Sequence, residues 1–344
     1  MSSIFGALRR RLLTPSVSET KLETRGFHRK NAEAQAQLET IGRVFLQGYG
    51  YAVGAGSAAE AEEMLETVPR AYRGFAYEGA GMGAVVHDAL PGHRGRLEGL
   101  LAGEGRHHVY MVYVGIGWAM ARLPKFLWPD VRRTDPLLRW LILDGYGFHQ
   151  AYFRTDEYVR DPQARHPFSW AGGPDEYSAR AIDQGIGRAL WFVGGTDADV
   201  VADLIAAYPA HRRGDLYAGA GLAATYAGAA DEEELRRLAE RAGEHRLQLA
   251  QGSAFAAEAR RKAGTTVAHT HLATRILCGT TPERAAQVCI DRMPAAGDRG
   301  DVPAYEVWRQ EIASEIASGI ASRVASGTAS ETASLSLSRK GADL

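Results

Sequence analysis

Apolar residues recur along most of the chain with the spacing of one face of an α-helix, as in the run 200–205 (VVADLI). Ser57 and Asp231 each stand three positions before a glutamate, which is the pattern of a helix-capping box. Thr281 precedes a proline, and proline is favoured at the first position of a helix. The β-branched and aromatic run 109–114 is the best strand candidate. Because strand signals are otherwise scarce, the pattern predicts an all-α fold.

A Gly-x-Gly motif recurs at intervals of 30 to 40 residues, with first glycines at Gly48, Gly79, Gly115, Gly145, Gly185 and Gly219 and a looser copy at Gly252. A period of this size is the length of one helix–turn–helix unit in a helical array. None of the motifs has the preceding strand and third glycine of a dinucleotide-binding loop. The glycines therefore indicate close packing of helices. The alternative is close approach of a bound ligand along the same inner face.

A longer repeat suggests that the chain is a duplication. Residues 69–81 match residues 209–221 at an offset of 140, sharing the pattern P-x3-R-G-x2-Y-x-G-A-G. Weaker matches follow at an offset of 137. We therefore expect about eight helix-pair units in two halves, at about 40–150 and 178–285. The array is either open or closed into an α/α toroid.

The ends of the chain differ from this repetitive region. Residues 1–39 form an N-terminal extension, and the helical repeat domain is expected to span 40–310. From 311 to 344 the composition becomes Ser- and Ala-rich, with Ala-Ser dipeptides every four residues from Ala313 onward. The first three turns of this tail can continue a helix, and the remainder is expected to be disordered.

Composition narrows the classes of partner. The chain has 344 residues, a formal net charge of -1 and 45% hydrophobic residues, which gives no electrostatic reason to expect nucleic acid. No apolar run approaches the roughly 20 residues that a bilayer requires, so no integral membrane segment is expected. The N-terminus lacks the apolar core of a signal peptide, and two cysteines are too few for a disulfide framework. These features favour a cytoplasmic protein.

Polar residues stand immediately before several of the repeated glycines, at Gln47, Glu78, Asp144, Gln184 and Gln251. Polar groups at glycine-flanked, otherwise apolar sites can line a shared cavity, where a desolvated acid can donate or accept a proton. The alternative is that they satisfy backbone groups at helix starts.

Aromatic residues cluster near two of these acids. His149 lies among four aromatic residues in the segment 144–153, where it is either a general base or an ordinary core histidine. Glu78, Asp144 and His149 are therefore the candidate catalytic residues. The candidate substrate-binding residues are Gln47, Tyr77, Tyr113, Trp118, Tyr146, Gln184 and Gln251.

Motifs for metals and cofactors are missing. His269 and His271, near Cys278, have suitable residue types for a metal site, but two histidines at this spacing on a helix point apart, and no fourth ligand lies nearby. The chain has no phosphate-binding loop, Gly-x-Ser-x-Gly elbow, His-Glu-x-x-His pair or Cys-x-x-Cys pair. We expect neither a metal nor a cofactor.

Five segments resemble one family: 73–82 (RGFAYEGAGM), 112–124 (VYVGIGWAMARLP), 135–149 (DPLLRWLILDGYGFH), 183–191 (DQGIGRALW) and 249–257 (LAQGSAFAA). Together they are similar to the bacterial domain-of-unknown-function family numbered 1702, over residues of about 20 to 310. That family is known mainly from actinobacterial gene clusters for enediyne polyketides. The resemblance implies a biosynthetic pathway, and it supplies neither a mechanism nor catalytic residues.

Two hypotheses about function remain. In the first, the inner face of the array encloses an apolar polyene or polyketide intermediate and promotes its modification, cyclisation or rearrangement. In the second, the array is a non-catalytic scaffold that binds or protects a pathway intermediate or a partner biosynthetic protein. An interior cavity lined by Glu78, Asp144 and His149 would favour the first.

Overall fold

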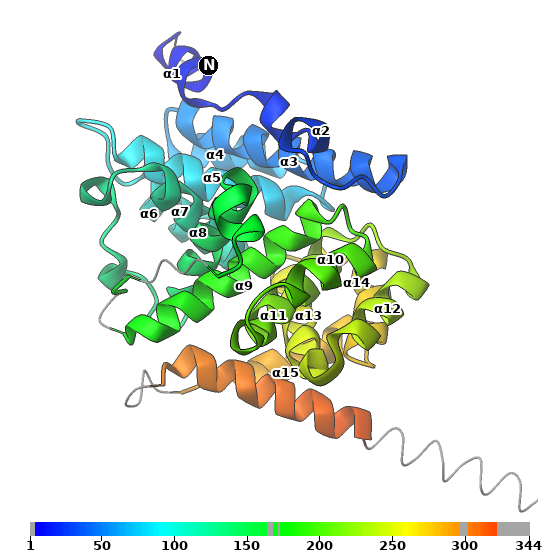
Figure 1. Cartoon of the computed structure of the whole chain (residues 1–344). Coiled ribbons are helices and arrows are strands. Elements are labelled where there is room, and N and C mark those ends of the chain that lie inside the picture. Colours follow the sequence, from blue (N-terminus) through cyan, green and yellow to red (C-terminus); the bar gives the residue numbers. More distant parts are fainter. Residues whose placement is uncertain (1–3, 164–167, 171–172, 296–301, 322–344) are drawn as a thin grey trace, which may run out of the picture.

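The computed structural model describes residues 4–163, 168–170, 173–295 and 302–321, and within these ranges it contains helices and no β-strand (Figure 1). The predicted all-α fold is confirmed. The strand candidate 109–114 is wrong, because these residues begin helix α7. Val112 and Val114 are buried there between neighbouring helices, and burial of this kind outweighs the weak preference of valine for strands.

The helices follow one another along the whole described chain. Their bounds are α1 Ile4–Leu13, α2 Leu22–Arg25, α3 Ala32–Gly54, α4 Ala58–Glu66, α5 Arg73–Asp88, α6 Arg96–Ala102, α7 Val109–Arg122, α8 Trp140–Phe153, α9 Asp175–Val193, α10 Ala198–Ala206, α11 Ala210–Ala227, α12 Glu232–Ala242, α13 Arg246–Lys262, α14 Ala268–Leu277, α15 Pro282–Asp291 and a final helix at 304–321. The sequence predicts the first residues of three of these helices from their capping residues. Ser57 and Thr281 accept bonds from backbone N–H groups of α4 and α15, and Asp231 forms a complete capping box on α12.

The long helices form a continuous inner series. Helices α3, α5, α7, α8, α9, α11 and α13 pack in that order, each against the next. The shorter helices pack onto this series, and they contact one another from α4 to α6 and from α10 through α12 to α14. On either side of α8 the described connections contain 3-10 turns and a π-helical turn in place of a short α-helix.

The repeated glycines are the contact points of the inner series. A Cβ on Gly185 would lie 1.8 Å from the carbonyl oxygen of Asp144 in α8, and a Cβ on Gly187 would lie 2.0 Å from that of Leu216 in α11. The first glycine of each pair therefore touches the preceding long helix and the second touches the following one. The same division holds for the pairs at 79 and 81, 115 and 117, 145 and 147, and 219 and 221. Any side chain at these positions would force two backbones apart, so the predicted close packing is confirmed here.

The segments 69–81 and 209–221 make similar contacts. Arg73 donates from Nε to the carbonyl of Val68, and Arg213 donates from Nε to that of Tyr208, five residues earlier in each case. The tyrosine of each segment stacks on a histidine, with 4.1 Å between the ring centroids of Tyr77 and His108 and 5.7 Å between those of Tyr217 and His245.

A set of charges, buried except for the partly exposed Arg180, holds the final helix, and we call Arg180, Asp215, Glu306 and Arg309 the anchor cluster. Arg309 donates from Nη1 to Asp215 Oδ1 at 2.7 Å and to Glu306 Oε2 at 2.8 Å. Arg180 donates to Asp215 Oδ2 at 2.8 Å and to Glu306 Oε1 at 2.9 Å. Two arginines therefore face two carboxylates, and every carboxylate oxygen of the cluster accepts a hydrogen bond.

The final helix includes the beginning of the low-complexity tail. Ile312 and Ile316 point into the core and are buried, which explains why this part of the tail is helical. The predicted disorder of the remainder concerns residues 327–344, which lie outside the described part of the chain.

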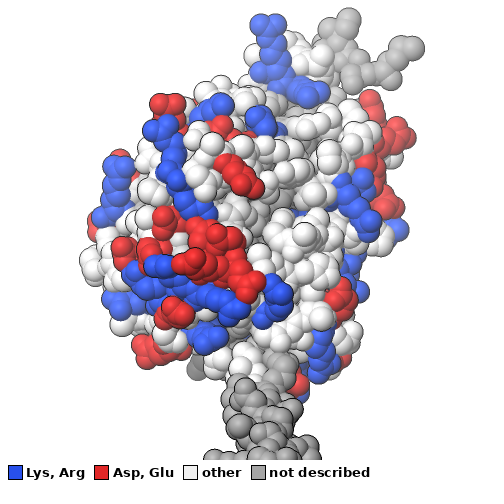
Figure 2. Space-filling model, turned by 90° about the vertical axis from the view of Figure 1, so that its right-hand side faces the viewer, with Lys and Arg blue, Asp and Glu red and all other residues white. Residues whose placement is uncertain are grey.

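Charges on the outer helices are mixed. Figure 2 shows basic and acidic side chains interleaved over the face that carries α10 and α12. Arg241 pairs there with Asp199 at 2.8 Å, and Arg237 also pairs with Asp199, at 3.3 Å. Exposed pairs of this kind contribute little to stability. Within the described residues no helix combines the length and apolarity that crossing a bilayer requires.

Candidate functional site

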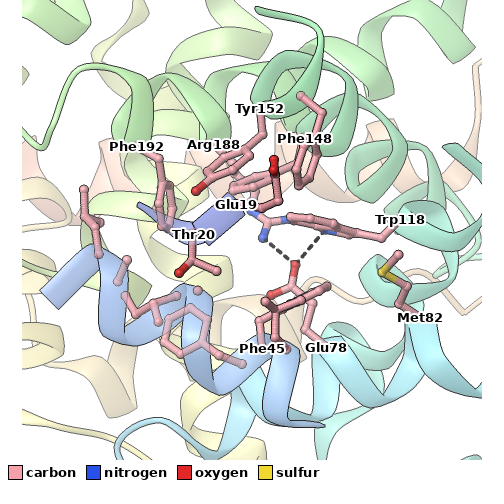
Figure 3. A pocket seen from close by; sticks show the side chains of 18 of the residues that line it. Glu19, Thr20, Phe45, Glu78, Met82, Trp118, Phe148, Tyr152, Arg188 and Phe192 are labelled. Carbon is pink, nitrogen blue, oxygen red and sulfur yellow. Dashed lines mark hydrogen bonds and ion pairs between the residues drawn. The ribbon is translucent and has the colours of Figure 1, made fainter. Parts of the chain in front are cut away.

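An apolar cavity lies between α3, α5, α7, α8, α9 and α11. Much of its wall is aromatic, formed by Phe45, Phe75, Trp118, Phe148, Tyr152 and Phe192 (Figure 3). The cavity is small, with a volume of about 70 Å³.

Residues 15–20, which we call the N-terminal cover, contribute to one side of this cavity. The lining residues nearest solvent are the exposed Arg122 and the half-buried Glu19, so the cavity opens beside the cover. Arg25 holds the cover in place, because it donates to Glu19 Oε2 at 3.0 Å and to the Tyr152 carbonyl at 2.9 Å.

One carboxyl group reaches the cavity from helix α5. Glu78 is 3% exposed, and its Oε1 accepts hydrogen bonds from Trp118 Nε1 at 3.1 Å and from Arg188 Nη2 at 3.3 Å (Figure 3). Its Oε2 accepts no hydrogen bond from the described residues. A buried carboxyl with one oxygen fixed and the other free, in an apolar wall, is placed to exchange a proton with a ligand.

Arg188 of α9 joins Glu78 to a second acid, Asp144 of α8, and we call these three residues the cavity cluster. Arg188 donates from Nη1 to Asp144 Oδ1, and the arginine also lies over the Phe148 ring, 5.1 Å from its centroid. Asp144 Oδ2 accepts no hydrogen bond from the described residues. One arginine therefore faces two carboxyl groups, and only half of the carboxyl oxygens are bonded.

This imbalance shifts the pKa values of all three residues of the cavity cluster. Burial raises the pKa of Glu78, Arg188 opposes that effect, and the nearby Asp144 carboxylate adds to it. Burial also raises the pKa of Asp144, against the opposing effects of Arg188 and Arg309. Burial disfavours the charge of Arg188, yet the two acids hold its pKa above the usual value. Arg188 lies closer to Asp144 than to Glu78, so it opposes the effect of burial more strongly at Asp144 than at Glu78.

His149 lies outside the wall of the cavity. It packs edge-on behind Trp118, with 5.5 Å between the ring centroids, and tilted against Phe153 at 4.7 Å. Burial lowers the pKa of His149 to about 3, so the ring is neutral at physiological pH. The structure therefore brings Glu78 and Asp144 together through Arg188 and leaves His149 one layer behind them.

Among the predicted substrate-binding residues, Trp118 lines the cavity and the others lie elsewhere. Each of the others has a hydrogen-bond partner of its own: Gln47 with Tyr51, Tyr77 with Glu66, Tyr113 with the Asp135 backbone, Tyr146 with Gln150, Gln184 with Tyr305, and Gln251 with Arg309. Gln184 and Gln251 face the final helix, which the repeat pattern gave no reason to place there.

Sequence reasoning missed Arg188, the centre of the cavity cluster. Its partner Glu78 is 110 residues away along the chain, and no local pattern joins the two. A usable signal was present, however. Arg188 directly follows Gly187 inside the apolar stretch IGRALW, and a charge at such a packed position requires a buried partner.

The histidines considered for a metal do not converge. His269 Nε2 lies 3.1 Å from the Tyr226 carbonyl oxygen, whereas His271 is exposed. Cys278 is buried with its Sγ directed to the Ala250 carbonyl. In the described ranges no three His, Cys, Asp or Glu side chains are grouped closely enough to hold a metal ion.

Fold and site together define an all-helical protein with a narrow, aromatic interior site and a charge cluster at its wall. The chain belongs to the family described as "Protein of unknown function (DUF1702)", which it matches over residues 4–316. This range includes the cover, the cavity and both charge clusters. No curated protein and no solved structure matches the chain.

Proposed function

We propose that the protein acts in the biosynthesis of an enediyne-type natural product, on an apolar polyene or polyketide intermediate that binds in the aromatic cavity. The pathway follows from the family resemblance of the sequence. The observation that carries the chemistry is the Glu78 carboxyl, whose Oε1 is held by Trp118 and Arg188 and whose Oε2 is free. We place the protein in the cytoplasm, and a partner biosynthetic protein is a further proposed contact.

The chemistry that fits this arrangement is proton transfer. Protonated Glu78 gives its proton to one unsaturated carbon of the chain, and the resulting carboxylate is stabilised by Arg188 and Trp118. The electron-rich faces of the aromatic wall stabilise the positive charge on the chain. Return of a proton from a neighbouring carbon to Glu78 completes an isomerisation, or a ring closure if a second double bond attacks the cation first. Atoms and charges balance without a redox partner.

The second function to be distinguished is sheltering without chemistry. The enclosed apolar wall supports it, because such a wall keeps a reactive polyene away from water whether or not Glu78 transfers a proton. A Glu78 variant distinguishes the two functions, because it removes proton transfer and leaves the sheltering wall intact.

We also propose that the inner helix series is a duplicated repeat array. The similar contacts of Arg73 and Arg213, and of the stacked Tyr77–His108 and Tyr217–His245 pairs, support this origin. The cavity cluster then draws its acids from the first half and its arginine from the second, so neither half alone would hold the complete site.

The test is deletion of the gene in a producing strain, complementation with single variants, and metabolite profiling. Glu78→Gln should reduce product by about 10²-fold or more, the lower end of what a general acid contributes, and a polyene should accumulate. Asp144→Asn should have a smaller effect, and His149→Ala the smallest if its variant folds. Unchanged production after deletion would refute the pathway. Full rescue by folded Glu78→Gln would favour sheltering over chemistry.

A further inference from the structure

A polar pocket on the surface, separate from the aromatic cavity, is lined by basic and small residues. It lies where α1, the start of α4 and the connection from α5 to α6 meet, and its volume is about 310 Å³. The titratable side chains among the described residues of its wall are all basic: Arg9, His87, His93, Arg94 and Arg96. A volume of this size lies within the usual range for small-molecule sites, about 300–1,000 Å³.

Arg96 is the buried charge of this pocket, with 6% of the residue exposed. Its Nη2 donates to the Ala55 carbonyl oxygen at 2.8 Å and to His87 Nε2 at 3.3 Å. Its Nη1 is buried and has no hydrogen-bond partner among the described residues. Burial of a charge without a counter-charge is costly, so an anion beside Arg96 would stabilise this arrangement.

Two histidines hold the arginines of the pocket without neutralising them. Arg96 donates to His87 Nε2, and Arg9 donates to His93 Nε2 at 2.8 Å. Because arginine only donates, each Nε2 is an acceptor and each ring carries its proton on Nδ1. The Nδ1 atoms have matching acceptors, Asp88 Oδ1 at 3.1 Å from His87 and a backbone carbonyl oxygen at 3.0 Å from His93. Both imidazoles are therefore neutral, and the arginines keep an uncompensated charge.

The nearest acids do not supply the missing negative charge. Both oxygens of Asp88 accept hydrogen bonds from backbone N–H groups at the start of α6, and Glu60 Oε2 accepts one from a backbone N–H before α4. Neither acid forms an ion pair with Arg9, Arg94 or Arg96 within the described part of the chain. Burial lowers the pKa of Arg96, Asp88 and Glu60 oppose this effect, and the charge of Arg9 adds to it, so that the pKa remains below its usual value.

We propose that this pocket binds a phosphate group, held by the guanidinium groups of Arg9, Arg94 and Arg96. Guanidinium groups match phosphate oxygens in charge and in the geometry of paired hydrogen bonds. The start of α4 at Ser57, which also lines the pocket, adds the positive end of a helix dipole. The pocket has about ten times the roughly 30 Å³ of one water molecule, so it holds a phosphate ester as well as inorganic phosphate.

The phosphate would also fasten the N-terminal helix. Arg9 belongs to α1, whereas Arg94 lies in the connection from α5 to α6 and Arg96 begins α6. A single bound group that contacts all three would therefore join α1 to the body of the protein. The pocket shares no lining residue with the aromatic cavity, so this binding function is independent of the proposed function.

The experiment is isothermal titration calorimetry of the full chain with inorganic phosphate and with glycerol 3-phosphate, at constant ionic strength. Arg9→Ala and Arg94→Ala change side chains that are at least partly exposed, and each should weaken binding by about tenfold or more, the effect of losing a hydrogen bond to a charged group. Arg11→Ala is the matched control, because it removes the same charge from α1 outside this pocket. It should leave binding unchanged.

A second arm distinguishes the source of the phosphate group with phosphatidylcholine vesicles that contain phosphatidic acid. Binding of any of the three probes that Arg9→Ala and Arg94→Ala weaken, and Arg11→Ala does not, supports the site, and the probe bound most tightly identifies the source. Absence of binding to all three probes would overturn the proposal. Equal losses in Arg9→Ala and Arg11→Ala would also overturn it, by showing a general attraction of α1 for anions. Either failure leaves the proposed function of the aromatic cavity intact.

Discussion

The two buried charge clusters use the same residue types for opposite purposes. In the anchor cluster two arginines face two carboxylates, and all four carboxylate oxygens are bonded. In the cavity cluster one arginine faces two carboxyl groups, and two of the four oxygens are unbonded among the described residues. Accordingly, Arg309 and Arg180 outweigh the effect of burial and hold the pKa of Glu306 below its usual value, whereas the pKa of Glu78 is raised.

The comparison shows that burial of a charged residue does not by itself indicate a reactive site. Charge balance and saturation of the hydrogen bonds distinguish a cluster that fastens a helix from one that can exchange a proton. The following experiments test that distinction, from the largest expected effect to the smallest.

Arg309→Ala tests the anchor cluster most directly. It leaves Asp215 and Glu306 buried with one partially exposed arginine, and we expect the free energy of unfolding to fall by about 3–5 kcal/mol. Urea denaturation measures the effect. Arg292→Ala, which breaks an exposed ion pair to Glu315, should cost under about 1 kcal/mol. Equal losses in both variants would show that the anchor cluster stabilises the fold no more than a surface pair does.

Glutamine substitutions compare the two acids on equal terms. Glu306→Gln removes a carboxylate that accepts hydrogen bonds from four groups. It should destabilise the fold by about 2–3 kcal/mol. Glu78 accepts hydrogen bonds from only two groups and its pKa is raised, so Glu78→Gln should cost less, under about 1 kcal/mol. The comparison fails if Glu78→Gln is the more destabilising variant.

The two clusters should respond to pH in opposite directions. The raised pKa of Glu78 gives stability that is complete below its ordinary value of 4.5 and is lost as pH rises through the folded-state pKa. The lowered pKa of Glu306 gives stability that is present above 4.5 and is lost as pH falls through the folded-state pKa.

Unfolding free energies from about pH 2 to about pH 8 test these signs. Relative to wild type, Glu78→Gln should gain stability as pH rises, and Glu306→Gln should lose it. Parallel curves for the two variants would contradict the opposite directions of the two pKa shifts.

The smallest expected difference in stability between the two regions concerns two buried tyrosines. The Tyr177 hydroxyl donates to Glu306 at 2.9 Å, and Tyr177→Phe should cost about 1 kcal/mol. The Tyr226 hydroxyl beside the cavity has no hydrogen-bond partner among the described residues, so Tyr226→Phe should leave thermal stability unchanged or slightly higher. A larger loss from Tyr226→Phe than from Tyr177→Phe would show that hydrogen-bond saturation does not separate the two regions.

Local signals in the sequence predicted the helical elements well. Capping at Ser57, Asp231 and Thr281 depends on neighbouring residues alone, and helix packing at the glycines depends on the absence of a side chain. Both are readable without knowing the fold. The strand candidate 109–114 failed because its valines are buried by helices that come from distant parts of the chain.

The candidate site was less predictable, because its geometry depends on contacts between distant helices. Glu78 and Asp144 were selected for their glycine neighbours, but the pairing with Arg188 requires α9 to pack against α8 and the Arg188 side chain to reach Glu78 on α5. Gln184 and Gln251 occupy the same position relative to their glycines, yet the final helix covers them. The repeat alone could not foresee this difference, because the covering residues lie beyond the repeated region.

The glycine contacts also bear on how fast a molecule can enter or leave. Where two backbones touch, as at Gly185 and Asp144, no side chain lies between the helices. A change of rotamer therefore cannot open a path for a molecule between these two helices. Exchange of a bound molecule would then pass through the open end beside the cover at residues 15–20, which Arg25 fixes. The width of that one opening, as well as the aromatic contacts inside, would set the residence time within the protein.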